Sequence, residues 1–308
     1  MTRRVANHTS PALVVSLLVL TLCGFGCSLK RNTDFQFVVA ADMRGYTPPD
    51  HPGPGYFAGA CAAIRDYGPG AFIIVPGDLD PPQRVRATLS AIVGPEYVWY
   101  PVLGNHEFDG VDYMPYLREC NAGGTTLPGI VRAGPPNAVE TCYSFDHGIA
   151  HFVVVNQYYD GQSDTGCDGD VGDALYEWLA ADLAANDMPV VFVVGHEPTV
   201  AMPDMDNGRV RHQGDSLDKY PEHNHRFWTL LRQHDVVAYI CGHTHDTSVA
   251  KINGVWQLDA GHARGLGDTG APSTFMKIAV TDEDVRCQVY RCATPGEPYQ
   301  MVYEERLR

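Results

Sequence analysis

The stretch Tyr239-Ile-Cys-Gly-His-Thr-His245 decides how the rest of the chain is interpreted. The mostly apolar residues 236–240 predict a buried strand that stops at a glycine. His243 and His245 follow with one residue between them, and side chains two positions apart on an extended segment point the same way. Two imidazoles side by side at the carboxyl end of a strand can bind one metal ion or two. Taken alone, the pair is also compatible with a surface loop.

Four more predicted strands end in polar side chains. Runs rich in β-branched and aromatic residues predict strands at 35–41, 71–75, 97–103 and 189–194. They lead into Asp42, Asp78, Asn105 with His106, and His196, respectively. Segments with helical periodicity separate these strands, which is typical of the α/β class. In such folds the site lies in the crevice beyond the carboxyl ends of the strands, so we expect these side chains to meet there.

The residue types at these strand ends favour metal chemistry. Each alone has an ordinary explanation, such as a helix cap or a turn. Together, carboxylates, an amide oxygen and imidazoles form a mixed oxygen and nitrogen ligand set for divalent or trivalent metal ions. A carboxylate that bridges two cations offsets their repulsion, and two metals can clamp the attacking and leaving oxygens of an in-line displacement.

Composition narrows the possible partners. The chain has 308 residues with 44% hydrophobic and 10% aromatic residues, which describes a globular protein with a sizeable core. It carries 22 basic and 37 acidic residues, a net charge of −15. No basic run stands out beyond Arg3-Arg4, so no surface for a nucleic-acid backbone is expected. An anionic substrate would need a cation bound by the protein.

Residues 1–27 predict a signal peptide, and residues 34–308 a single domain. The uncharged, Leu- and Val-rich segment 11–25 precedes Gly26-Cys27, which resembles a bacterial lipoprotein signal in which Cys27 would be lipidated. Gly24 stands where that signal usually has leucine, so ordinary cleavage or retention as a short anchor also fits. We expect an exported protein, periplasmic or at the cell surface, with possible membrane attachment through this segment.

Export permits disulfides. Seven cysteines follow Cys27, and Cys241 in the opening strand is interpreted as a small core residue. The other six allow three bridges in fifteen ways. The favoured pair is Cys120 with Cys142, because the segment between them is rich in glycine and proline. Residues 109–141 are predicted to be an insertion over the site.

The order of the strand-end motifs resembles the calcineurin-like metallophosphoesterases, which include purple acid phosphatases and cyclic-nucleotide phosphodiesterases. The motifs are Asp-x-x from 42, Gly-Asp-x-x from 77, Gly-Asn-His-Glu at 104–107, Gly-His at 195–196 and Gly-His-x-His at 242–245. The resemblance spans residue 35 to about residue 258. It implies a four-layer α/β/β/α sandwich with two mixed sheets. It also implies hydrolysis of phosphate mono- or diesters by a metal-bound water or hydroxide at a two-metal centre.

The resemblance also implies a role for each residue. Asp78 would bridge two metal ions of Mn, Fe or Zn. The remaining metal ligands would be Asp42 and His245 for the first ion, and Asn105, His196 and His243 for the second. His106 would not bind metal but would lie over the phosphate, as a general acid for the leaving group or as a stabiliser of the transferring phosphoryl. Substrates would be small phosphate esters.

Arg44 departs from the family pattern, since many members have histidine at this position as a ligand of the first metal. Arg44 has no lone pair to give. It is interpreted as a catalytic residue that binds a substrate phosphate oxygen. Two other interpretations remain: a structural ion pair with a carboxylate such as Asp80, or a weak first metal site. The weak site is the feature that favours a non-catalytic relative that binds metal or phosphate. The loops 109–141 and 200–221, which would select between mono- and diesters, carry no recognisable motif.

Overall fold

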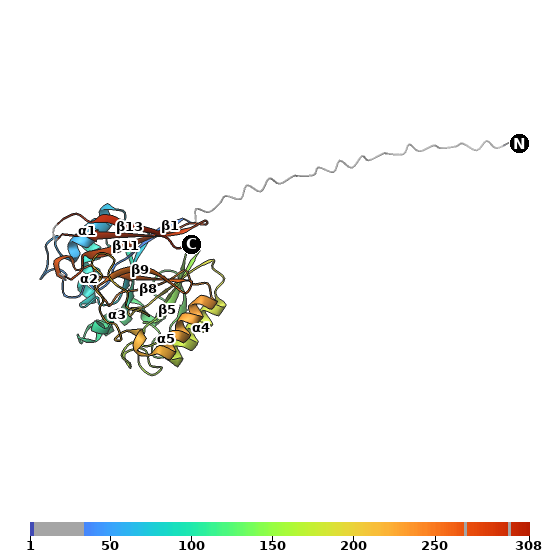
Figure 1. Cartoon of the computed structure of the whole chain (residues 1–308). Coiled ribbons are helices and arrows are strands. Elements are labelled where there is room, and N and C mark those ends of the chain that lie inside the picture. Colours follow the sequence, from blue (N-terminus) through green and yellow to red (C-terminus); the bar gives the residue numbers. More distant parts are fainter. Residues whose placement is uncertain (3–33, 268–269, 295–296) are drawn as a thin grey trace. The chain divides into compact units, whose positions relative to one another are not determined.

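The computed structural model describes residues 1–2, 34–267, 270–294 and 297–308 (Figure 1). The predicted signal peptide, including Cys27, lies outside these ranges apart from its first two residues. The chain divides into two units, Met1–Asn32 and Thr33–Arg308, and the second contains all the elements described below. Among the described residues, no helix has the length and apolar character needed to cross a membrane.

The first sheet, as far as the chain is described, has six strands in the order β13-β12-β11-β1-β2-β3. The strands β1, β2 and β3 run parallel. The strand β11 pairs antiparallel with β1, β12 with β11 and β13 with β12, so the sheet is mixed. Their bounds are β1 (Phe35–Val39), β2 (Phe72–Pro76), β3 (Val98–Val102), β11 (Ser273–Val280), β12 (Val285–Cys292) and β13 (Gln300–Arg306).

The second sheet is also mixed. Within the described part of the chain it has seven strands in the order β4-β5-β6-β7-β8-β10-β9. The central strands β6, β7, β8 and β10 are parallel, while β4, β5 and β9 pair antiparallel. The bounds are β4 (Ile130–Ala133), β5 (Tyr143–His147), β6 (Ala150–Val154), β7 (Val190–Val194), β8 (Ala238–Cys241), β9 (Thr247–Ile252) and β10 (Val255–Ala260).

Helices cover the outer face of each sheet (Figure 1). The buried faces of α1, α2 and α3 pack with outward residues of the first sheet, such as Val38 and Ile73. Those of α4 and α5 pack with Val153 and Val193 of the second. The helix bounds are α1 (Phe57–Asp66), α2 (Pro82–Ile92), α3 (Tyr113–Cys120), α4 (Asp173–Ala185) and α5 (Pro221–Gln233). The predicted order of layers, helix, sheet, sheet, helix, is confirmed.

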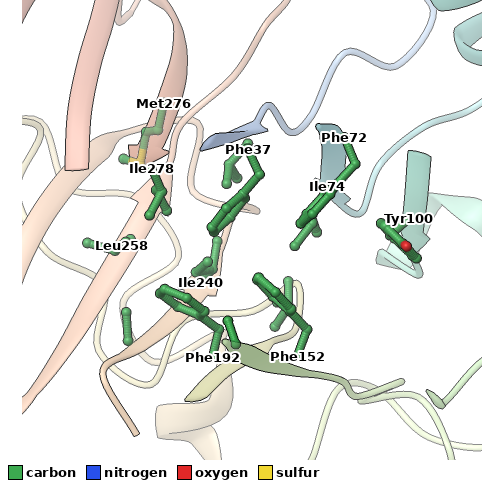
Figure 2. Packing of buried hydrophobic residues seen from close by; sticks show 14 of the residues in the cluster. Phe37, Phe72, Ile74, Tyr100, Phe152, Phe192, Ile240, Leu258, Met276 and Ile278 are labelled. Carbon is green, nitrogen blue, oxygen red and sulfur yellow. The ribbon is translucent and has the colours of Figure 1, made fainter. Parts of the chain in front are cut away.

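The core between the two sheets follows from the alternation of strand side chains. On β1, Phe37 and Val39 point into this core, while Val38 points to the helices. Both faces of the parallel strands are buried, so their sequences are continuously apolar rather than alternating. Figure 2 shows Phe37 and Phe72 of the first sheet facing Phe152 and Phe192 of the second. The rings of Phe37 and Phe152 meet edge to face, with centroids 5.1 Å apart.

The segment predicted as an insertion, 109–141, contributes regular structure to the sandwich. It forms α3 and also β4, which pairs with β5 as an edge of the second sheet. Outside this segment, α5 begins at Pro221, because proline is well suited to the first position of a helix.

The favoured disulfide between Cys120 and Cys142 is wrong, since both residues are free thiols. They pack into different layers: Cys142 is buried under α4 and α5, whereas Cys120 lies against the core of the first sheet and its helices. The Sγ atom of Cys142 accepts a hydrogen bond from the backbone N–H of Asn156 at 3.4 Å. Cys241 is a buried thiol, as the sequence predicts.

Candidate metal centre

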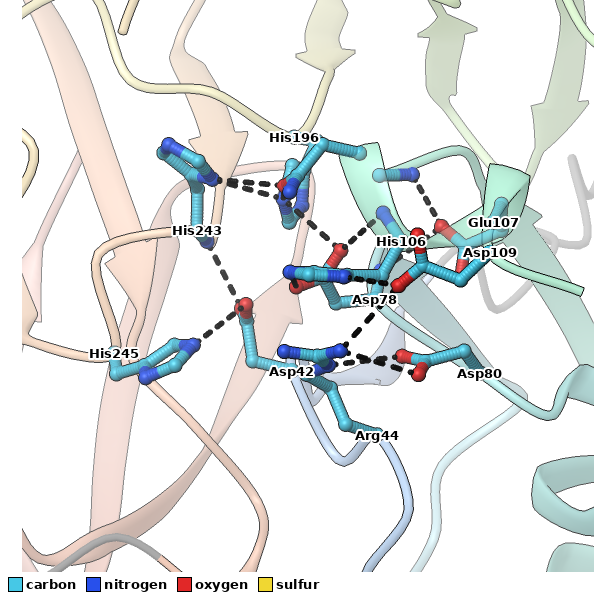
Figure 3. A network of polar contacts seen from close by, with 12 residues as sticks. Asp42, Arg44, Asp78, Asp80, His106, Glu107, Asp109, His196, His243 and His245 are labelled. Carbon is cyan, nitrogen blue, oxygen red and sulfur yellow. Dashed lines mark hydrogen bonds and ion pairs between the residues drawn. The ribbon is translucent and has the colours of Figure 1, made fainter. Parts of the chain in front are cut away.

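The residues predicted to bind metal lie where the strands of both sheets end (Figure 3). Asp42 follows β1 and Asp78 follows β2, while Asn105 begins a short 3-10 helix, η1 (Asn105–Phe108), after β3. On the second sheet, His196 follows β7 and the pair His243 and His245 follows β8. Parallel strands of each sheet end at the same edge, which brings these distant positions together.

The backbone at four of these positions is left-handed. The φ angles are 56° at Asp42, 56° at Asp78, 71° at His243 and 59° at His245. Non-glycine residues are uncommon in this region, which costs energy, and such residues cluster at functional sites. The surrounding structure therefore turns the chain sharply at each strand end and aims the side chain into the crevice.

Asp42, Asp78 and His245 form one candidate metal-binding group. One ligand atom of each residue lies within 4.8 Å of those of the other two, and all three residues are buried. Asp42 Oδ1 is 3.4 Å from His245 Nε2 and has no hydrogen-bond donor within the described structure. A buried carboxylate oxygen without a donor is costly unless a cation compensates it. The donor set therefore fits a metal ion.

Asn105, His196 and His243 form a second group next to the first. Asn105 Oδ1 is 3.2 Å from His196 Nε2 and 3.2 Å from His243 Nδ1, and the two ring nitrogens are also 3.2 Å apart. Asp78 Oδ1 lies 3.4 Å from His196 Nε2. Ligands about 2.1 Å from a tetrahedral metal are separated by about 3.4 Å, so this spacing also fits an ion. Asp78 contacts both groups.

Burial and neighbouring charges set the protonation of these groups. Burial opposes the charge of Asp42, but the neighbouring His245 and His196 bring its pKa below the usual range. Burial and the charge of His196 lower the pKa of His243 to about 2, so this imidazole is neutral. Burial also opposes the charge of His196, but Asp78 and Asp42 raise its pKa to about 9. A metal ion at His196 would therefore displace a proton.

Glycines before the ligands allow this close approach. A Cβ atom on Gly77, whose φ is +84°, would lie 2.2 Å from Nδ1 of His196. A Cβ on Gly242 would lie 2.4 Å from Oδ2 of Asp42. Only glycine lets these backbones pass so near the ligands. The Gly-Asp and Gly-His pairs of the sequence thus reflect the packing of one strand end against another.

His196 is oriented by groups that the sequence does not reveal. Its Nδ1 lies 2.7 Å from the backbone oxygen of Pro76 and donates to it, which directs Nε2 toward Asn105. The side-chain oxygen of Gln157 accepts from the backbone N–H groups of His196 and Glu197, at 2.8 and 2.7 Å. Gln157 follows β6 and carries no motif, so sequence reasoning misses it. Such outer partners fix the direction of a metal-binding imidazole.

His106 lies at the solvent side of the site, with 28% of its side chain exposed. Its Nε2 is 3.9 Å from Asp78 Oδ2, and its Nδ1 is 2.6 Å from Asp109 Oδ2. Arg44 pairs with Asp80 through Nε at 3.2 Å, and its Nη2 is 3.6 Å from Asp109 (Figure 3). The structural ion pair with Asp80, one of the three interpretations of Arg44, is thus present. Arg44 and His106 share Asp109 as a neighbour.

The loop 200–221, predicted as part of the substrate rim, delivers two residues to the ligands. Arg211 Nη1 contacts His245 Nδ1, and the ring of His212 lies 4.2 Å from that of His243. Arg264, which follows β10, reaches His245 from another direction. The sequence Gly-His-Ala-Arg directly after β10 is a signal that could have placed Arg264 near the site.

A four-layer sandwich with carboxylates, an amide and imidazoles at its strand ends defines the metallophosphoesterase class. The family model described as calcineurin-like phosphoesterase matches residues 35–247, and the chain belongs to this family. No curated protein matches the sequence.

Solved structures share the fold at low sequence identity. A structure of PhoD has a TM-score of 0.62 and 13% identity, over 88% of this chain and 69% of the other. A structure of GAP50, described as the anchor in the inner membrane complex of Plasmodium, has a TM-score of 0.57 and 12% identity, over 89% and 88%.

Proposed function

We propose that this protein hydrolyses small phosphate esters at a centre of two metal ions. The observation that carries the proposal is the convergence of Asp42, Asp78 and His245, with their ligand atoms within 4.8 Å of one another. The second group, around Asn105 and His196, lies directly beside it. Membership of the calcineurin-like phosphoesterase family supports metal-dependent hydrolysis of phosphoesters.

The two ligand sets would share Asp78. One set is Asp42, Asp78 and His245, and the other is Asp78, Asn105, His196 and His243. Their nitrogen and oxygen donors are compatible with Mn, Fe or Zn. When bound, the ions would supply positive charge for the phosphate oxygens and lower the pKa of a water molecule. A net charge of −15 makes such local positive charge necessary for an anionic substrate.

His106 and Arg44 are the residues that would act on the substrate directly. Asp109 lies 2.6 Å from Nδ1 of His106 and orients the ring, so that Nε2 points toward Asp78 and the site. As a general acid, His106 would give a proton from Nε2 to the leaving oxygen. Arg44 keeps Nη1 for a phosphate oxygen while Nε and Nη2 face Asp80. Both side chains remain partly exposed, so a substrate can reach them.

Assays of the purified full chain test the proposal. Aryl phosphate mono- and diesters are offered with Mn²⁺, Fe²⁺ or Zn²⁺, after removal of metal with a chelator. We expect hydrolysis that requires added metal and that is lost in Asp78→Asn. Asp66→Asn, which changes an exposed carboxylate at the end of α1, is the matched control. Bound metal without hydrolysis of either ester would falsify the enzymatic proposal. The ratio of the two rates assigns the substrate class.

The second candidate is a non-catalytic protein of the same fold, since the GAP50 structure is described as an anchor. The first ligand set favours this candidate, because Arg44 replaces an expected imidazole and Arg264 contacts His245. The pairing of His106 with Asp109 favours the enzyme, since a binding protein has no need of a positioned acid beside the metal ligands. The same assays separate the two candidates.

A further inference from the structure

Arg264 is fixed against the first ligand set at two points. Only 7% of its surface is exposed. Its Nε donates to the backbone oxygen of Asp42 at 2.6 Å, and its guanidinium lies 5.6 Å from the ring centroid of Tyr46. A cation over an aromatic face and a hydrogen bond to the backbone are both stabilising. The guanidinium is therefore part of the walls of the site and not a mobile surface group.

The third contact of Arg264 is with a predicted metal ligand. Its Nη2 lies 2.8 Å from Nε2 of His245, the nitrogen that faces Asp42 Oδ1 at 3.4 Å. Guanidinium nitrogens are donors only, so a hydrogen bond here requires the tautomer of His245 that has its lone pair on Nε2. A bond from histidine to metal is about 2.0–2.1 Å long and uses the same lone pair. The hydrogen bond and the metal bond therefore exclude each other.

The positive charge of Arg264 also opposes the binding of a metal ion at His245. A guanidinium stays protonated at any ordinary pH, so it cannot be neutralised to admit a second cation. Its Nη2 must instead move away from His245, although Nε is bonded to the backbone of Asp42 and the guanidinium packs on Tyr46. In the described contacts, no guanidinium approaches the metal-facing nitrogens of the second ligand set. Nε2 of His196 and Nδ1 of His243 contact each other and the amide oxygen of Asn105.

We propose that Arg264 competes with metal for His245, so that the two ions of the centre bind with unequal affinity. The ion held by Asp78, Asn105, His196 and His243 binds tightly, and the ion at Asp42 and His245 binds only at higher metal concentration. Until then the guanidinium supplies the positive charge at this position. This inference rests on the proposed function, but it concerns metal binding and not turnover.

Titration of the metal-free full chain with Mn²⁺ alone tests the inference. Free Mn²⁺ is counted by its electron paramagnetic resonance signal, and bound metal is counted by elemental analysis. We expect two binding steps with clearly different affinities in the wild type. His245→Ala should remove the weaker step and leave the tighter one, because His245 belongs to the first ligand set alone.

Two arginine variants then distinguish competition for the lone pair of His245 Nε2 from simple electrostatic repulsion between an arginine and the metal ion. Arg264→Met keeps an unbranched apolar stem but removes the guanidinium and frees Nε2, so the weaker step should strengthen by roughly 10- to 100-fold, the size of effect seen when groups bound to a metal ligand are changed. Arg211→Met removes an equal charge from the same imidazole, but on Nδ1, so it should change that step much less. Circular dichroism confirms that each variant is folded.

Three outcomes would overturn the inference. Two equal affinities in the wild type would show that Arg264 does not compete, and this result depends on no variant. An unchanged or weakened second step in Arg264→Met would show the same. An equal gain in Arg211→Met would assign the effect to charge and not to the lone pair. Binding of no Mn²⁺ at all would instead reject the proposed metal-dependent function together with this inference.

Discussion

The carboxylate of Glu107 holds the backbone of Asp78. It accepts hydrogen bonds from the N–H groups of Asp78 at 3.1 Å and Leu79 at 2.6 Å, and its Oε2 also accepts from Gly104 at 2.5 Å. Glu107 is fully buried. It therefore ties the end of β3 to the end of β2 and sets the position of the carboxylate that both ligand sets share.

Glu107→Gln should destabilise the protein and weaken metal binding. A glutamine places an NH₂ group against backbone donors and leaves at least one of them unpaired, which costs about 1–3 kcal/mol. Urea unfolding measures the free energy of unfolding, and elemental analysis measures the bound metal. Glu96→Gln, an exposed residue before β3, is the control. If Glu107→Gln matched this control in both measurements, the positioning role would be rejected.

His106→Asn should lower kcat by roughly 10²- to 10⁴-fold, the usual contribution of a general acid, without loss of bound metal. Asp109→Asn should have a smaller effect in the same direction, because it leaves His106 in place but removes its partner at 2.6 Å. Steady-state kinetics with metal content measured in parallel check both variants.

The leaving group distinguishes the two possible roles of His106. A general acid matters most when the leaving oxygen is basic, so His106→Asn should impair phenyl esters much more than nitrophenyl esters. If both ester types lost the same factor, His106 would act on the transferring phosphoryl group and the acid role would be excluded.

Arg44→Ala should lower kcat/KM by roughly 10²- to 10³-fold, as removal of one donor to a developing negative charge typically does, and the metal content should stay unchanged. Arg44→Lys should recover only part of the loss, because an ammonium lacks the fork that spans Asp80 and a phosphate oxygen. Loss of metal in Arg44→Ala would contradict this role. Activity equal to that of the wild type would reduce Arg44 to a structural partner of Asp80.

The sequence was sufficient to predict the layers and the strand ends because both depend on local patterns. Continuous apolar runs such as 71–75 indicate strands buried on two faces, and a polar residue after each run indicates the edge where they end. The predicted ligands Asp42, Asp78 and His245 do come together. Such agreement is expected where local propensity and the global fold favour the same arrangement.

The residues that support the ligands could not be predicted because their contacts are long-range. Gln157 binds the backbone of His196, 39 positions away, and Glu107 binds Leu79, 28 positions away. No sequence pattern indicates which backbone groups a glutamine or glutamate after a strand will contact. The same holds for the disulfide, since Cys120 and Cys142 are close in sequence but belong to different layers of the sandwich.

A buried network of polar side chains lies beneath α4, away from the metal ligands. His151 on β6 lies 2.7 Å from Asp146 Oδ1 through Nδ1 and 2.8 Å from Asp182 Oδ2 through Nε2. Ser144 donates to the other oxygen of Asp182 at 2.8 Å. Burial opposes the charge of His151, but hydrogen bonds to Asp182 and Asp146 outweigh it and raise its pKa above the usual 6.5.

Because folding raises the pKa of His151, its contribution to stability depends on pH. A group whose pKa is raised by folding stabilises the protein fully below the unfolded value of about 6.5, and this contribution is lost as the pH rises through the folded pKa. His151→Gln should therefore reduce the free energy of unfolding by about 1–3 kcal/mol at pH 6 and by less in alkaline buffer. Urea unfolding of both proteins across this range measures the difference, with His225→Gln on the exposed side of α5 as control. A difference that stayed constant with pH would show that folding does not raise the pKa of His151.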